Sequence, residues 1–392
     1  MKKAFIMLPL AVACASQFAM AATTDSQRLA QLEQELEMLK EASSYDSLSD
    51  RMSINGFFTG KVGIASNDAG YNGYDKDADF SEGSKLGLQG SFALTEQTKI
   101  VAQLVARGSD DWATEMEWAF LSHDFDNGFV TRIGRLRVPL YMYSDYLEVG
   151  FAQPWANPPS ELYSIVPLSS FDGIDAIYDF DLADVSVTLQ ASYGHADRDT
   201  GPKLGEVDYK DILGASASFA YEEWVFRTTY YQTTLDTTKD GQITQFFDDE
   251  QSYFAGVGLS YDNGSLLAIS EFAVSDVEGD YSDTQSGYIT LGYRISDFTP
   301  YVTYAFLETT DDSERIGGNP QLGLEPAFNW KRDAYSIGTR YDISSNLALK
   351  VDVTYADGFD DTSGGLSSNL DSLGNQVNED TIVYTISFDA VF

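Results

Sequence analysis

The chain has 392 residues, and 61 Asp and Glu against 24 Lys and Arg give it a formal net charge of -37. This charge excludes a generic nucleic-acid-binding surface, because attraction to phosphate requires positive charge. One Cys and two His exclude a tetrahedral metal site built from His and Cys ligands. A mean hydropathy of -0.23 excludes a bundle of membrane helices, but not membrane strands that alternate apolar and polar residues.

The first residues have the pattern of a secretory signal peptide. Two lysines follow the first Met, residues 4–15 are mostly apolar, and residues 19–21 have a small-x-small cleavage pattern. We therefore predict that 1–21 is a signal peptide and that the mature chain lies outside the cytoplasm. Lipid attachment at Cys14 is the alternative, and it is disfavoured because the usual leading Leu is missing before it.

Residues 22–50 are predicted to form a short helix followed by a polar linker. The leucines of the helix are spaced 3, 4 and 3 residues apart, as in the a/d seam of a coiled coil: Leu29, Leu32, Leu36 and Leu39. Two heptads are too short to be stable alone in water. Two readings stay open: a helix that packs on its own domain, and a small coiled coil that helps the protein form a trimer.

From residue 51 to 392 the apolar residues recur at every second position, which indicates strands. Residues 347–355 show the alternation most clearly, with Leu, Leu, Val, Val and Tyr on one face. The pattern predicts sixteen strands near 54–64, 84–94, 98–107, 115–123, 129–137, 173–180, 185–194, 211–221, 224–233, 251–261, 266–274, 285–295, 299–307, 331–341, 347–356 and 380–392.

The connections between these strands alternate between tight turns and long acidic loops. This rhythm, together with an even strand number and Tyr residues at strand ends, is typical of an outer-membrane barrel. The alternative is a periplasmic sandwich or propeller, whose strands average about 5–6 residues, shorter than those predicted here. We therefore predict an all-β fold, a 16-stranded antiparallel transmembrane barrel with short periplasmic turns and long outer loops.

Three features of the sequence resemble known porins of Gram-negative bacteria. The chain ends on alternating aromatics and Phe392, residues 132–180 resemble the third-loop region of trimeric gammaproteobacterial porins, and the leucine seam is similar to that of DcaP-type porins. The resemblance implies a homotrimer in the outer membrane with loop 3 folded into each pore. It also implies that the barrel-assembly machinery reads Phe392, and that lipid and lipopolysaccharide surround the barrel.

Basic residues in the predicted strands mostly lie on the face opposite the apolar one. A charge on the lipid face costs about 2–4 kcal/mol at the membrane midplane, so we place these residues in the lumen. The predicted basic wall beside loop 3 consists of Arg132, Arg135, Arg137, Lys61, Lys85, Lys99 and Arg107. Arg132 and Arg135 cannot both point inward from a regular strand, so one of them is expected elsewhere.

Loop 3 would oppose this wall with the carboxylates of Asp145, Glu148 and Glu161. Opposed charges create a transverse field that orients polar solutes, although the same arginines could simply pair with the loop and fix its position. Loop 3 also carries the aromatics Tyr141, Tyr143 and Tyr146. They could form a track for sugars, but packing of the folded loop is the simpler interpretation.

The sequence contains no nucleophile elbow, phosphate loop or HExxH motif, so we expect no enzymatic activity and no cofactor. Acidic clusters such as 75–79 and 248–250 could bind Ca²⁺ or bridge to lipopolysaccharide, but a solvated surface is the preferred interpretation and no metal site is predicted. The predicted function is passive diffusion of ions and small hydrophilic solutes. The alternative is a non-conducting structural or adhesive barrel whose acidic loops bind cations, lipopolysaccharide or a partner.

Overall fold

The computed structural model describes residues 48–200, 205–240, 246–279, 281–311, 328–371 and 375–392. The chain divides into two compact units, Met1–Arg51 and Met52–Phe392. The described part of the first unit is one helical turn, α2 (Leu48–Arg51). The predicted signal peptide and the leucine seam at 29–39 lie outside the described residues. In the part that is described, no helix is long and apolar enough to span a membrane.

The second unit contains sixteen strands. Their bounds are β1 (Met52–Ala65), β2 (Lys85–Ala93), β3 (Thr98–Arg107), β4 (Thr114–Asp124), β5 (Phe129–Arg137), β6 (Ser170–Leu182), β7 (Val185–Asp199), β8 (Gly205–Tyr221), β9 (Trp224–Asp240), β10 (Glu250–Asp262), β11 (Leu266–Val277), β12 (Thr284–Tyr293), β13 (Phe298–Thr309), β14 (Lys331–Ser344), β15 (Leu347–Asp357) and β16 (Thr381–Val391). Short helical turns interrupt the connections: η1 (Tyr71–Gly73), η2 (Gly108–Asp110), η3 (Ser144–Tyr146), η4 (Gly150–Ala152), α3 (Ser160–Tyr163) and η7 (Ser367–Asn369).

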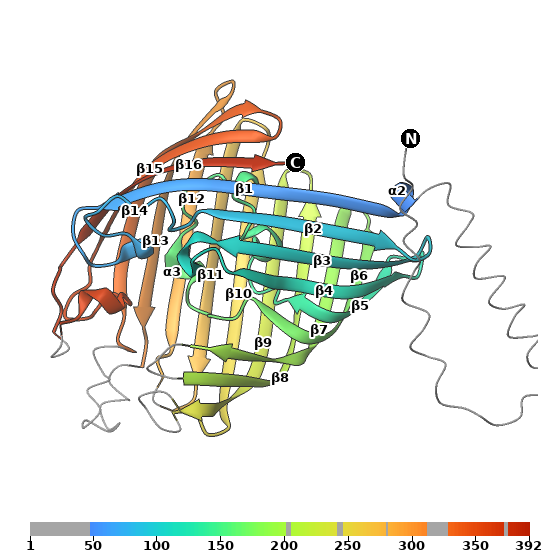
Figure 1. Ribbon diagram of the computed structural model, residues 1–392, viewed down its shortest axis with the longest axis horizontal. Coiled ribbons are helices and arrows are strands. Elements are labelled where there is room, and N and C mark those ends of the chain that lie inside the picture. The colour runs from blue at the N-terminus through green and yellow to red at the C-terminus, as the bar shows by residue number, and fades with distance from the viewer. Residues whose placement is uncertain (1–47, 201–204, 241–245, 280, 312–327, 372–374) are drawn as a thin grey trace, which may run out of the picture. The chain divides into compact units, whose positions relative to one another are not determined.

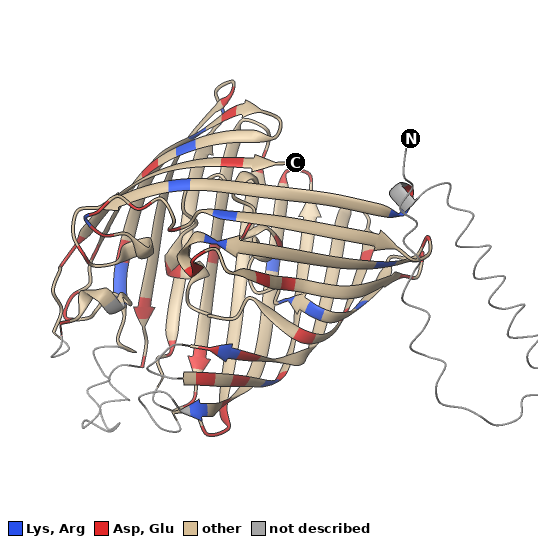
Figure 2. Cartoon of the chain, viewed as in Figure 1, with Lys and Arg blue, Asp and Glu red and all other residues tan. Residues whose placement is uncertain are grey.

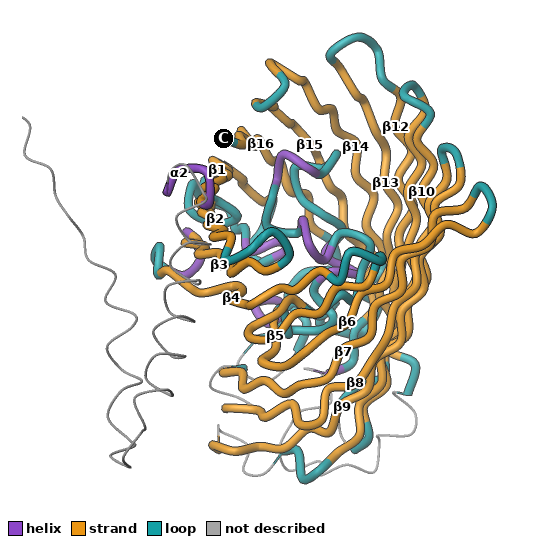
Figure 3. The backbone as a smooth tube through the Cα atoms, turned by 90° about the vertical axis from the view of Figure 1, so that its right-hand side faces the viewer, coloured by secondary structure: helices purple, strands orange, loops and turns teal. Residues whose placement is uncertain are grey.

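Each strand pairs antiparallel with its neighbours in sequence, and β1 pairs with β16 to close the barrel (Figure 1). The closure extends to the last residue, because Gly56 and Phe392 exchange backbone hydrogen bonds of 2.7 and 2.9 Å. Figure 3 shows the strands in order around the wall, with short connections at one end. We call this end the turn end, and the opposite end, where the long connections lie, the loop end. The prediction of a 16-stranded antiparallel barrel is confirmed.

The two faces of the wall differ in polarity in the way expected of a membrane barrel. On β15 the inward residues Lys350, Asp352 and Thr354 are 1%, 2% and 4% exposed, whereas outward Val351 is 40% exposed. The same alternation leaves large apolar side chains on the outside of most strands. A polar interior and an apolar exterior invert the pattern of a water-soluble protein and fit a wall surrounded by lipid.

Three strands are longer than the sequence indicates. β7, β8 and β9 continue through much of the segments 195–209 and 234–250, which we expected to be loops. Cross-strand pairing supports these polar extensions, since the Lys210 ammonium lies 2.7 Å from the Asp236 carboxylate and 3.0 Å from that of Asp249. The extensions alternate less clearly in hydrophobicity, because strands that pair with one another beyond the membrane need no apolar outer face.

Two turn glycines give a test of the wall geometry. Gly128 and Gly264 both have left-handed backbone, with φ of 83° and 82°, so alanine costs about 1–3 kcal/mol at either site. A Cβ on Gly128 would also overlap the carbonyl oxygen of Asp179, whereas nothing lies within 4 Å of one on Gly264. We expect Gly128→Ala to lower the urea midpoint of unfolding, followed by gel mobility, clearly more than Gly264→Ala. Equal shifts in the two variants would contradict the close approach of Gly128 to the Asp179 carbonyl group.

Candidate functional site

The connection between β5 and β6, residues 138–169, is the predicted loop 3, and it lies against the inner face of the wall. Its described hydrogen bonds and ion pairs reach inward side chains on β1–β3, β9 and β11–β16. Its short helix α3 packs against β11, β12 and β13, and η4 packs against β1 and β16. Segments far apart in sequence thus hold one loop across the lumen.

One side of loop 3 is held by basic residues on adjacent strands. Lys85 is paired with both Thr59 and Arg107 in the sheet register, and basic positions lie near one another on β1, β2 and β3 (Figure 2). Glu148 accepts hydrogen bonds from Lys85 at 3.0 Å and from Arg107 at 2.9 Å. Lys61 donates to the Asn157 side chain at 2.8 Å. The loop carboxylate offsets the repulsion between neighbouring cations.

These cations also determine the protonation of Glu148. Burial would raise the pKa of its carboxyl, but Lys85, Arg107 and Arg137 together hold it well below the usual range. A second carboxylate, Glu117 on β4, bonds to Arg107 and lies 3.0 Å from Arg137. Glu117 is unpaired at the register shift between β3 and β4, which turns it inward. With Glu115, which lies 3.0 Å from Arg107, the result is a network of three cations and three carboxylates at one edge of the loop.

Backbone carbonyl groups of loop 3 rest on buried cations from β14 and β15. The Lys350 ammonium, 1% exposed, donates to the carbonyl oxygens of Gly150 at 2.6 Å and Trp155 at 3.0 Å, and it lies 3.1 Å from Asp389. Arg340 donates to the Gln153 carbonyl at 3.0 Å. Because each cation is shared between the wall and the loop backbone, the loop cannot leave without exposing unpaired charge.

Glu161 is held at β14, three strands from β1 around the closed barrel. It is completely buried and accepts a 2.7 Å bond from Arg332 of β14 and a 3.1 Å bond from the Tyr71 hydroxyl. Burial raises the pKa of Tyr71, so this phenol stays protonated and donates. Glu161 therefore joins the connection after β1, loop 3 and β14, and it does not face Arg132, Arg135 or Arg137.

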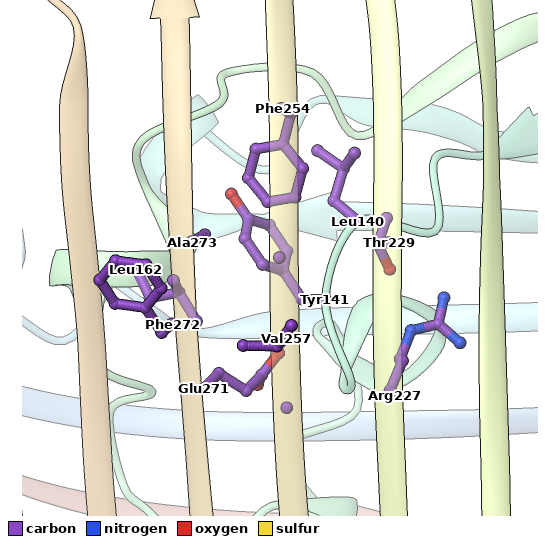
Figure 4. A pocket seen from close by; sticks show the side chains of 12 residues that line it. Leu140, Tyr141, Leu162, Arg227, Thr229, Phe254, Val257, Glu271, Phe272 and Ala273 are labelled. Atoms are coloured by element: carbon purple, nitrogen blue, oxygen red, sulfur yellow. The ribbon is translucent and has the colours of Figure 1, made fainter.

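The remaining edge of loop 3 is apolar and aromatic. Tyr141 makes edge contacts with Tyr163 and Phe254 at centroid distances of 5.1 and 5.4 Å. Figure 4 shows Tyr141, Phe254, Arg227 and Glu271 around a small cavity between loop 3 and β9–β11.

Tyr143 packs edge-on against Trp155, whereas Tyr146 is 55% exposed. Tyr141 and Tyr143 are therefore packing residues of the folded loop, and Tyr146 is the one predicted aromatic of loop 3 with an exposed ring.

Of the three predicted acidic residues of loop 3, Asp145 is the exposed one. Its charge influences Arg132 of β5 and Arg227 of β9 without an ion pair to either among the described residues. Arg132 is bidentate with Asp175 on β6, with 2.9 Å between Nε and Oδ1, and its side chain is 20% exposed. Arg227 donates to the Ser216 and Ser218 hydroxyls at 3.1 Å. Within the described residues no ion pair to Arg227 is formed.

Polar side chains continue from this point down the inner face of β6 and β7 to the turn end. Asp179 and Asp181 share the inward parity of Asp175, are exposed, and accept hydrogen bonds from Thr188 and Ser186. Exposed carboxylates on an inner face require water beside them. A hydrated strip of wall therefore runs from Asp145 to the turn end.

Two of the predicted wall residues do not face loop 3. Arg135 is exposed, pairs with Ala119, and shares its parity with Ile133, which is 57% exposed. It therefore lies on the outer face, on the opposite parity to Arg132. Lys99 is exposed at the start of β3 beside the tight turn, too near the turn end to meet the loop.

Several wall residues that bond to loop 3 lie in the predicted strands, but the sequence did not indicate that they contact the loop. Arg227, Arg340 and Lys350 are on inward parity, and alternation alone indicates that they line the lumen. Asp175 also lies on inward parity, within the predicted strand 173–180, but it was not among the predicted site residues. The contacts of Arg227, Arg340 and Lys350 with loop 3 depend on barrel closure, because they join residues 88 to 200 positions apart in sequence.

No chemistry beyond charge and hydrogen bonding is indicated at this site. Among the described residues, no group of three or more His, Cys, Asp or Glu side chains is arranged to hold a metal ion. The acidic stretch at 75–79 is partly used locally, since the Asp79 carboxylate accepts backbone hydrogen bonds from Ser81 and Glu82 at 2.6 and 2.7 Å.

Comparisons with known proteins give a fold. No protein-family model matches the sequence, and no curated protein matches it. Solved structures do match. A loop-deletion mutant of OmpT, an outer membrane protein of Vibrio cholerae, has 11% identity and a TM-score of 0.56 over 88% of this chain and 100% of its own.

Two further solved structures are porins. An anion-selective porin from Comamonas acidovorans has 14% identity and a TM-score of 0.55, covering 87% of this chain and 99% of that one. Salmonella typhi OmpF, in a complex with daunomycin, has 14% identity and a TM-score of 0.58, covering 87% and 97%. At such identities the likeness shows that this chain has the fold of outer-membrane porins.

The low pKa of Glu148 predicts that loop 3 stays fixed in mild acid. A depressed pKa means that the stabilisation is fully present above the ordinary value of about 4.3 and is lost progressively as pH falls from there to the lower folded-state value. Hydrogen exchange of residues 144–153, corrected for intrinsic rates, should therefore stay slow at pH about 4, within about threefold of its rate at pH 7.

The Glu148→Gln variant should lose this protection at both pH values, by about tenfold, because a charge-assisted hydrogen bond is removed. Glu115→Gln is the matched control. Glu115 also bonds Arg107, at 3.0 Å, but its side chain is 56% exposed and it is not part of the loop. Wild-type protection that disappears at pH about 4 would contradict the assignment.

Proposed function

We propose that this protein is an outer-membrane porin, a passive diffusion channel for ions and small hydrophilic solutes. The observation that carries the proposal is the hydrated strip of inner wall on β6 and β7, where Asp179 and Asp181 are exposed on inward parity. A closed barrel with a polar lumen and an apolar outside supports passage through its interior. A non-conducting barrel would be the alternative.

The proposed constriction is smaller than the sequence indicates. Lys61, Lys85, Arg107 and Arg137 fix loop 3 through Asn157, Glu148 and Glu117, so their charges are largely neutralised where they lie. Among the described residues beside loop 3, Asp145 and Arg227 form no ion pair, whereas Arg132 is paired with Asp175. We propose that the field between this carboxylate of loop 3 and Arg227 lies across the narrow point, where small polar solutes orient in it.

The remaining parts of the proposal concern export, the N-terminal helix and assembly of the barrel. Residues 1–21 would direct export, 22–50 would form a coiled coil through Leu29, Leu32, Leu36 and Leu39, and 51–392 would form the pore. Phe392 at the barrel seam would serve as the signal for the barrel-assembly machinery, and lipid and lipopolysaccharide would surround the wall. Most charged and hydroxyl groups at the constriction are bonded to loop 3 or to the wall. We therefore propose no enzymatic role and no cofactor.

The outer face supports a homotrimer. Small residues meet on β2, β3 and β4, where Gly90, Ala102 and Ala119 are paired in register. Bulky aromatic side chains instead cover the outside of β6–β14, for example Tyr178, Phe226 and Tyr304, all about 40% exposed. The three small positions are flanked by Leu88, Ile100 and Leu121, which are 39–45% exposed, and we propose that a second wall packs there. One matching structure is a trimer form of OmpT from Vibrio cholerae, and we extend that state to this chain.

Ion selectivity tests the proposed constriction. In planar bilayers with a KCl gradient, Asp145→Asn should shift the reversal potential toward anions, because it removes the carboxylate that faces the passage. Arg227→Gln should shift it toward cations, and it leaves no carboxylate unpaired because Arg227 is bound to hydroxyls and a carbonyl.

Arg135→Gln is the matched control for this experiment, since it removes the same charge from the outer face and should leave the reversal potential unchanged. Shifts of the same size in Arg135→Gln and Arg227→Gln would show that the constriction does not lie at β9. A correctly folded wild-type barrel that never conducts would exclude the channel function and favour the structural alternative.

A bulky residue on the outer face tests the trimer. Ala102→Trp should disrupt subunit contact on β3, whereas Ala268→Trp, on the outer face of β11, should be tolerated because Trp is compatible with lipid. Native mass spectrometry of both variants checks the subunit number. We expect trimer loss for Ala102→Trp alone, and trimers of equal stability in both variants would rule out an interface at β2–β4.

A further inference from the structure

A second cavity lies at the loop end of the barrel, on the inner side of β7–β11. It has a volume of about 390 Å³, and its walls come from the end of loop 3, from β7–β11 and from the connections after β9 and β11. We call it the vestibule pocket. Small-molecule sites usually occupy about 300–1,000 Å³, so this cavity is large enough for one small ring compound.

The walls of the vestibule pocket are apolar, although the interior of a membrane barrel is normally polar. Val207, Leu235 and Val277 line it from β8, β9 and β11 and are 1%, 5% and 7% exposed. Pro167 and Ile165 of loop 3 close it on another side. Passage of ions requires none of these residues, and polar ones would be solvated more favourably in an aqueous vestibule.

Aromatic rings form a further boundary of the pocket. Phe247 and Tyr281 line it, and their ring centroids are 5.9 Å apart. Tyr281 also contacts Phe328 at 5.2 Å and Trp330 at 5.9 Å, so three connections of the chain fix its position. Tyr209 contributes a third ring from β8. Rings at such positions pair favourably with an aromatic guest in edge-on or offset geometry.

The polar groups of the pocket define the remaining chemistry of the guest. The hydroxyl-bearing Ser252 and Ser275 face it from β10 and β11, and Arg198 and Asp199 contribute opposite charges. Both charged residues are exposed, whereas the Val and Leu side chains of the walls named above are buried. Apolar walls also penalise a charged guest. The guest that fits is an uncharged ring with one hydroxyl that can bond to serine.

We propose that the vestibule pocket binds uncharged monocyclic aromatic solutes that carry a hydroxyl group and holds them at the loop end of the pore. The pocket shares Val166, Tyr209, Ser252 and Ser275 with a smaller cavity deeper along loop 3, which extends the apolar surface toward Tyr231, the partner of Ser192 at 3.0 Å. The role of delivering such solutes to the passage rests on the proposed channel function, whereas binding itself does not.

Calorimetry of the purified barrel with phenol tests the inference. A ligand of this size should bind with a Kd on the order of 1 mM, and glycerol should not bind. Ser275→Trp fills the pocket and should weaken phenol binding by about tenfold or more. Thr188→Trp places the same ring on the inner face of β7 nearer the turn end and should leave binding unchanged.

Ser275→Ala keeps the cavity, removes the hydroxyl and should weaken binding by about threefold to tenfold, so the inference stays testable if Ser275→Trp fails to fold. Absence of phenol binding, or equal binding by wild type and a folded Ser275→Trp, overturns it. Conductance in planar bilayers separates the two proposals. A barrel that binds phenol without conducting contradicts only the channel, and one that conducts without binding contradicts only the pocket.

Discussion

A charge that is removed from water must be neutralised where it lies, and this constraint organises the interior of the barrel. Breaking a buried ion pair by removing one partner costs about 3–5 kcal/mol. Lys350, Arg332 and Glu161 are each no more than 3% exposed, and all three are shared between the wall and loop 3. The loop is therefore fixed by the same groups that it neutralises.

This shared neutralisation makes the lumen asymmetric. The cations of β1–β3 and β14–β15 are engaged with carboxylates and carbonyl groups of loop 3, so the loop lies against that part of the wall. The inner face of β6 and β7 keeps exposed carboxylates instead. Most charges inside the barrel thus act as structural contacts, and we propose that a few, such as Asp145 and Arg227, act on solutes.

Much of the fold could be predicted from the sequence because alternating polarity along a barrel strand indicates which side chains face the lumen. The period-two pattern located all sixteen strands, and parity correctly placed Lys61 and Lys350 on the inner face. Parity also showed that Arg132 and Arg135 could not both point inward, and the structure assigns Arg135 to the outside. The polar extensions of β7–β9 were missed because they pair with one another and need no apolar face.

The candidate site was less predictable, since its geometry depends on contacts between distant segments. Nothing near Glu161 in the sequence indicates that Arg332 lies beside it. From the sequence alone, the three acidic residues of loop 3 could not be divided into buried and exposed ones. Barrel closure separates them into two buried contacts, Glu148 and Glu161, and one exposed residue, Asp145.

Chemical accessibility of these loop positions distinguishes a loop fixed by buried charge from a loosely held one. Cysteine placed at 145 or at 161, in a barrel without other cysteines, can be treated with a charged thiosulfonate reagent during bilayer recording. We expect the reagent to react rapidly at position 145 and change the current, and a folded Glu161→Cys barrel to react slowly without a change. Rapid reaction with equal effects at both positions would contradict a loop fixed by buried charge beside an open passage.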